Sequence, residues 1–88
     1  MNLAQRMLFV GMDVGKSEVF VAVHGQPGTA RFANDPAGHR AVLSWLATVH
    51  GHPQVGLEAT GGYEAALWEA LEKAGFAVRQ LPPAQVKA

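Results

Sequence analysis

Two runs of apolar and β-branched residues near the start of the chain constrain its fold more than any other feature. The segments LFVGMDV (8–14) and SEVFVAV (17–23) are separated only by Gly15 and Lys16. Two such runs joined by a short glycine-containing link predict a tight antiparallel hairpin. The segment TARFA (29–33) follows a turn rich in glycine and proline, which extends the prediction to a three-stranded antiparallel meander.

The next segments predict a helix and then a buried strand. Asn34 or Asp35 can cap a helix that has Pro36 at its first position, and apolar residues at helical spacing extend this helix to about residue 50. Gly51, His52 and Pro53 end it. The apolar segment QVGLE (54–58) then predicts a short strand that ends in an acid.

The last predicted elements are a second helix and a fifth strand. Tyr63, Leu67, Leu71 and Ala74 share one helical face, and Gly75 followed by Phe76 is typical of a glycine-terminated helix. The segment AVRQL (77–81) is the fifth strand, ended by two prolines. Short connections and right-handed crossovers give an α/β fold with a mixed sheet in the order 3-2-1-4-5 and two helices.

Asp13 and Glu58 are the candidate catalytic and metal-binding residues. In the predicted order they lie near the carboxyl ends of adjacent parallel strands, which are only ~4.8 Å apart. Gly11 and Gly56 precede the two acids on the same face, and we expect open space beside each carboxylate. Two carboxylates this close repel each other unless a hard cation such as Mg²⁺ or Mn²⁺ lies between them. The alternative for each acid is a solvated carboxylate at the end of a strand or a helix cap.

Four further residues are candidates for binding nucleic acid. Thr60, Gly61 and Gly62 open the second helix, where backbone amides hold phosphate, although an ordinary helix cap explains them equally well. Lys16 lies close to Asp13 and can contact a phosphate, although its place in a hairpin turn is the favoured explanation. The four histidines form no recognised zinc spacing and are expected at the surface, and the two tryptophans are expected to pack.

Composition narrows the class of protein without selecting a function. The seven basic and seven acidic residues of this 88-residue chain balance, so any contact with DNA depends on local geometry. The chain has no cysteine, which excludes disulfides and thiolate sites and fits the cytoplasm. No apolar run approaches the ~20 residues of a membrane span, so we expect no membrane partner.

Three segments carry a resemblance to a known family: GMDVGKSEVFVAV, FANDPAGHRAVLSWL and VGLEATGGYEAALWEALEKAGFAVRQLPPAQVKA. Together they resemble the N-terminal domain of the DEDD-type insertion-sequence transposases, which include Piv-like invertases. The resemblance implies an RNase H-like, RuvC-like fold and a site of four acids that bind metal in the order Asp, Glu, Asp, Asp. Asp13 matches the first acid and Glu58 the second.

The resemblance places the other two acids, and a C-terminal domain with a serine nucleophile, beyond Ala88. Residues 1–88 are therefore expected to form part of a catalytic domain that binds Mg²⁺ or Mn²⁺ weakly and is inactive alone. The resemblance further implies DNA as partner and, for the full-length protein, a structured guide RNA. An open sheet edge and a short chain favour a homo-oligomer.

Three hypotheses on function follow. The first is the catalytic domain of a DNA transposase. The second is a nucleotide-binding half-domain of the sugar kinase and actin superfamily, whose opening hairpin Asp13, Gly15 and Ser17 partly match, while Lys16 and Glu18 suit it poorly. The third is a non-catalytic module that self-associates through its sheet edge and tryptophans. Binding of ATP favours the second hypothesis, and a downstream Asp-x-x-Asp pair favours the first.

Overall fold

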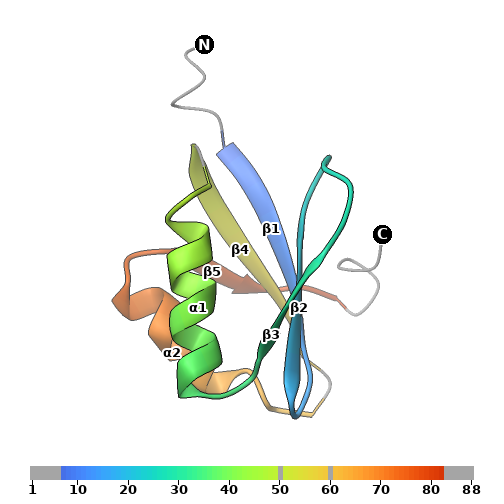
Figure 1. Ribbon diagram of the computed structural model, residues 1–88, viewed down its shortest axis with the longest axis vertical. Helices are drawn as coiled ribbons and strands as arrows, with labels where there is room; N and C mark the ends of the chain where they lie inside the picture. The colour runs from blue at the N-terminus through green and yellow to red at the C-terminus, as the bar shows by residue number, and fades with distance from the viewer. Residues whose placement is uncertain (1–6, 50, 60, 83–88) are drawn as a thin grey trace.

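The computed structural model describes residues 7–49, 51–59 and 61–82 of the chain. They form a five-stranded mixed sheet in the order β3-β2-β1-β4-β5, with two helices (Figure 1). β1 is antiparallel to β2 and parallel to β4; β2 is antiparallel to β3, and β4 is parallel to β5. The predicted order is therefore confirmed. The elements are β1 (Met7–Val14), β2 (Glu18–Val23), β3 (Ala30–Ala33), α1 (Pro36–Leu46), β4 (His52–Ala59), α2 (Ala65–Lys73) and β5 (Ala77–Gln80).

Both helices cover the same face of the sheet, as Figure 1 shows. Side chains alternate between the faces of a strand, so every second residue of β1, β2 and β4 points into the layer beneath the helices. These residues and the inner sides of α1 and α2 form a single core. Its members are Val10, Met12, Val14, Val19, Val21, Val23, Val42, Leu46, Val55, Leu57, Leu67 and Leu71.

Helix α1 begins as predicted and ends earlier. Asp35 is the N-cap, and its carboxylate accepts a hydrogen bond of 2.7 Å from the Gly38 amide, with Pro36 at the start of the helix. The predicted end near residue 50 is wrong, because the helix ends at Leu46. The Thr48 hydroxyl donates to the Trp45 carbonyl at 2.6 Å, and local hydrogen bonds of this kind compete with continuation of a helix.

Helix α2 begins later than its apolar spacing predicts. Tyr63 belongs to the preceding turn and is 45% exposed, so its predicted place on the buried helical face is wrong. Gly62 has a positive φ of 77°, which interrupts helical geometry just before Tyr63. The predicted end is confirmed: Gly75 has φ 92°, and the Phe76 amide donates to the Leu71 carbonyl at 3.1 Å.

Strand β4 starts two residues before its predicted beginning and includes Pro53, which we expected to lie outside it. Pro53 pairs with Leu8 of β1, whereas pairing with β5 begins only at Gln54. At Pro53 the strand therefore has a single neighbour, which is a position where a sheet tolerates proline.

Candidate metal centre and its neighbouring loops

The parallel register of β1 and β4 sets the two candidate acids side by side. Asp13 pairs with Glu58, and two residues earlier Gly11 pairs with Gly56. Because Met12 and Leu57 point into the core, their neighbours Asp13 and Glu58 point to the face that the helices leave bare. The topology thus brings together two carboxylates that lie far apart in the sequence, at the carboxyl ends of two adjacent strands.

The two carboxylates differ in their surroundings. Asp13 is half-buried, whereas Glu58 is only 4% exposed. Among the described residues, the Oε2 atom of Glu58 is the buried side-chain atom that has no hydrogen-bond partner. A buried carboxylate oxygen without a partner is unfavourable, and a bound cation is one way to satisfy it. The donor chemistry at this point therefore suits a hard divalent ion.

The site has few ligands within the described part of the chain. No group of three or more His, Asp or Glu side chains that could hold a metal occurs there. Two carboxylates leave most positions of an octahedral ion to water or to other groups. The role of Asp13 and Glu58 as ligands remains a prediction.

The space beside Glu58 is not open as the sequence suggested. A Cβ atom at Gly56 would collide with the side chain of Leu81, which lies over this glycine. The Leu81 amide continues the sheet by donating to the Leu57 carbonyl at 2.8 Å. Gly56 therefore accommodates Leu81, and this packing explains its small size better than access to the acid does.

Lys16 lies in the turn that connects β1 with β2, three residues after Asp13. The turn is longer than predicted, because β2 begins at Glu18 and the Gly15 amide donates to the Glu18 carbonyl at 2.9 Å. Gly15 has no positive φ, so its conformation does not require glycine. The Lys16 side chain is exposed at the end of the sheet where the acids lie.

The residues predicted to bind phosphate at the start of the second helix lie before that helix. Thr60 lies outside the described residues, and Gly61 and Gly62 belong to the turn before α2. The helix begins at Ala65 with Glu64 as N-cap, and no side chain caps it. The Gly61 and Gly62 amides are therefore not those of the first helical turn, although they remain close to the end of β4 that carries Glu58.

Asn34 connects the loops that follow the two acids. The sequence did not predict this role. Its Nδ2 donates to the Gly15 carbonyl at 2.8 Å and to the Tyr63 carbonyl at 3.0 Å. Its Oδ1 lies 2.6 Å from Nε2 of His39. Since Oδ1 can only accept, Nε2 of His39 carries the proton. The signal in the sequence for this role was the pair Asn34–Asp35 before Pro36. Because a helix needs only one N-cap, here Asp35, the side chain of Asn34 can bind elsewhere.

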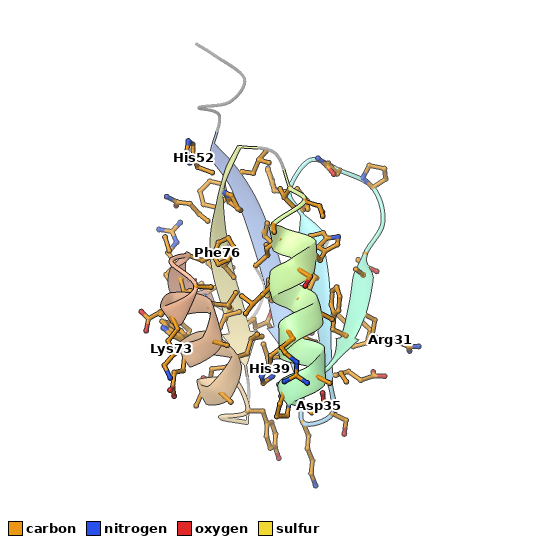
Figure 2. All side chains as sticks on the ribbon, turned by 60° about the vertical axis from the view of Figure 1, so that its left-hand side comes forward. Arg31, Asp35, His39, His52, Lys73 and Phe76 are labelled. Carbon is orange, nitrogen blue, oxygen red and sulfur yellow. The ribbon has the colours of Figure 1, made fainter. Side chains whose placement is uncertain are left out.

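His39 is buried, so its predicted surface position is wrong. It is 7% exposed, and burial lowers its pKa below the ordinary value, an effect that the nearby Asp35 carboxylate partly opposes. His24 and His52 are exposed, and His50 lies outside the described residues. Figure 2 shows His39 and His52 toward opposite ends of the molecule, so these two histidines do not share a site.

The two tryptophans and Arg79 make packing contacts. Trp45 packs against Phe32 with ring centroids 6.3 Å apart, and Trp68 packs against the core, as expected for the tryptophans. The Arg79 guanidinium lies over the Phe9 ring at 5.7 Å from its centroid.

The fold and the acid pair define a class of protein. A mixed sheet in the order β3-β2-β1-β4-β5, helices on one face and acids ending the two central parallel strands agree with an RNase H-like α/β domain. Over residues 10–88 the sequence matches a transposase family, the DEDD transposases of the IS110 type. The chain belongs to that family, which supports the first of the three hypotheses drawn from the sequence.

No curated protein matches the chain. Within the described ranges, neither helix is long and apolar enough to cross a membrane.

Proposed function

We infer that Asp13 and Glu58 together hold a divalent metal ion, Mg²⁺ or Mn²⁺, in a RuvC-like active site that acts on DNA phosphodiesters. The observation that carries this inference is the pairing of Asp13 with the buried Glu58, whose Oε2 has no other partner. Membership of a transposase family makes DNA the expected substrate. When bound, the metal supplies Lewis-acid stabilisation of the phosphoryl oxygens.

The residues of this chain provide only part of such a site. Asp13 and Glu58 supply two carboxylate ligands from adjacent strands, whose parallel register places them side by side. Lys16, Gly61 and Gly62 lie in the loops that follow the two acids and are proposed to contact phosphates of the substrate. The chain alone is expected to bind metal with millimolar-range affinity and to leave DNA intact, because a two-metal clamp needs further ligands.

Metal binding is tested with Mn²⁺ titration followed by NMR line broadening, which locates the ion as well as measuring its affinity. The isosteric variants Asp13→Asn and Glu58→Gln remove one charge each with little change in volume. We expect each to weaken binding at least about tenfold, because a carboxylate supplies most of the attraction to a hard cation. Glu69→Gln is the matched control, since Glu69 is an exposed acid that pairs with Lys73 at 3.0 Å on α2.

Broadening that is unchanged in Asp13→Asn and Glu58→Gln, or equally reduced in Glu69→Gln, would remove the metal-site assignment. A second experiment incubates the chain with branched and linear DNA and Mg²⁺. No cleavage is expected, and turnover above that of a Glu58→Gln control would contradict the proposed dependence on further acids. A structured guide RNA as a further partner and self-association of the chain into a homo-oligomer belong to the same proposal.

A further inference from the structure

A hollow of about 480 Å³ lies beside the loops that follow Asp13 and Glu58. Lys16 comes from the loop after Asp13, and Tyr63 comes from the loop after Glu58. The first turns of α1 contribute Arg40, and Leu43 and Ala66 form part of the apolar wall. Each loop that leaves the acid pair therefore supplies one side of the same hollow.

The hollow is built on an internal hydrogen-bond network. Asn34 donates to the carbonyls of Gly15 and Tyr63, and thereby ties the two loops together. His39, which lies on α1 (Figure 2), donates to Asn34 and is itself buried. Burial lowers the pKa of His39 and so favours its neutral form, which can make this bond through Nε2–H. The backbones of the two loops are thus joined at Gly15 and Tyr63 by half-buried Asn34, which buried His39 contacts in turn.

The charges around the hollow favour an anionic ligand. Lys16 and Arg40 form no salt bridge among the described residues, whereas Arg31 and Lys73 are paired with Glu18 and Glu69. The one acid that lines the hollow, Asp35, accepts the capping hydrogen bond from Gly38. The hollow consequently presents two cations that have no carboxylate partner in the described part of the chain.

Tyr63 adds a surface on which a flat ligand can stack. It is 45% exposed, and its ring lies over Gly61, where a Cβ atom would collide with it. An aromatic ring that lines the same hollow as two cations matches a nucleic-acid strand, whose phosphates bind lysine and arginine and whose unpaired bases stack on aromatic side chains. In a duplex the bases are already stacked on each other, so the ring would find no partner there.

We propose that Lys16, Arg40 and Tyr63 form a binding surface for a single nucleic-acid strand, held in shape by Asn34 and His39. The strand lies across the end of the sheet, with its phosphates on Lys16 and Arg40 and one unpaired base on Tyr63. This inference rests on the proposed function only in taking the substrate to be a nucleic acid. It does not require that Asp13 and Glu58 bind metal.

The test measures the fluorescence anisotropy of labelled oligothymidine of about ten nucleotides, a length that one small domain can cover. The titrations use the 88-residue chain in EDTA and are repeated over a series of salt concentrations. Lys16→Gln and Arg40→Gln are each expected to weaken binding several-fold and to reduce the slope of log K against log salt by about 0.7. Tyr63→Ala is expected to weaken binding about tenfold, and Tyr63→Phe, which keeps the ring, to leave it nearly unchanged.

Two control variants lie away from the hollow. Lys73→Gln removes the same charge as Lys16→Gln, and Figure 2 shows Lys73 on the outer side of α2. Phe9→Ala removes an aromatic ring that is 47% exposed, at the opposite end of β1 from Asp13. Both are expected to bind the oligonucleotide like the wild type. Circular dichroism of every variant confirms that the fold is retained.

Several results would overturn the proposal: no binding by the wild-type chain, a salt slope that Lys16→Gln and Arg40→Gln leave unchanged, or equal losses in Lys73→Gln. Tighter binding of a duplex than of the single strand would also overturn it. An oligouridine arm distinguishes a DNA strand from an RNA strand, and preference for either one supports the surface and identifies its source. Because EDTA removes metal, failure of the metal site leaves this measurement unaffected.

Discussion

The two faces of the sheet differ sharply, although the same strands form both. On the face beneath α1 and α2, the β1 residues Val10, Met12 and Val14 are at most 1% exposed. On the other face Phe9 and Phe20 are 47% and 42% exposed. A groove of about 810 Å³ runs over that bare face, between the loop after β2 and Leu81. Alternation along each strand assigns neighbouring residues to opposite environments.

The comparison indicates a division of roles between the two faces. The helix-covered face contains the buried apolar side chains that stabilise the fold, because removal of apolar area from water is the main favourable contribution to folding. The bare face carries Asp13 and Glu58 at the ends of its central strands. Substitutions on the two faces should therefore affect different properties.

The largest expected difference concerns large apolar residues. Leu57→Ala, on the covered face, should reduce the free energy of unfolding by about 3 kcal/mol, because it leaves a cavity in a fully buried layer. Phe20→Ala, on the bare face, should cost about 1 kcal/mol or less, since it removes mainly cross-strand contacts. Urea unfolding of both variants measures the difference. Equal losses would show that the bare face is as important to stability as the core.

A glycine pair offers a second contrast. At Gly38, a Cβ atom would collide with the backbone carbonyl of Ala33, which cannot move without shifting the junction of β3 and α1. Gly38→Ala should destabilise the protein by about 2 kcal/mol, in the range found for overpacked sites. Gly56→Ala should cost less than half as much, because only the Leu81 side chain has to move. Thermal unfolding compares them, and a larger loss for Gly56→Ala would contradict the contrast.

Self-association tests whether the bare face forms an interface between copies of the chain. The tryptophans were expected to contribute to an interface, yet the exposed large apolar side chains of the described residues are Phe9, Phe20 and Tyr63. We predict concentration-dependent association that the double substitution Phe9→Glu and Phe20→Glu weakens about tenfold, a change of about 1.4 kcal/mol. Light scattering across a concentration series measures it. Tyr63→Glu is the control, and an equal effect there would exclude the bare face as the interface.

The smallest expected effect is a dependence on pH at His39. Burial lowers the pKa of His39, so the folded protein binds its proton less readily than the unfolded chain does. The stability that neutral His39 contributes to the folded state is fully present above the unfolded pKa of about 6.5. It is lost as pH falls through the lowered folded pKa. Stability should thus decrease on acidification, and less so in His39→Gln, whose amide can still donate to Asn34. Identical pH profiles for the two proteins would argue against this role.

The sequence by itself determined the sheet order and the pairing of the two acids. Three extended runs followed by alternating helix and strand allow few topologies, because crossovers are right-handed and connections short. Once β1 and β4 are adjacent and parallel, Asp13 and Glu58 must share one end of the sheet. The Asp35 cap and the Gly75 stop were also predictable, because their hydrogen bonds join residues close in the chain.

Only the tertiary structure decided which side chains surround the end of the sheet that carries Asp13 and Glu58. Asn34 and Asp35 are equally good caps in the sequence, and what separates them is that Asn34 reaches Gly15 and Tyr63, which lie 19 and 29 residues away. The burial of His39 and the packing of Leu81 over Gly56 likewise depend on contacts between segments that are distant in the sequence. Periodicity reports which face a residue is on, whereas contacts between distant segments depend on how those segments meet in space.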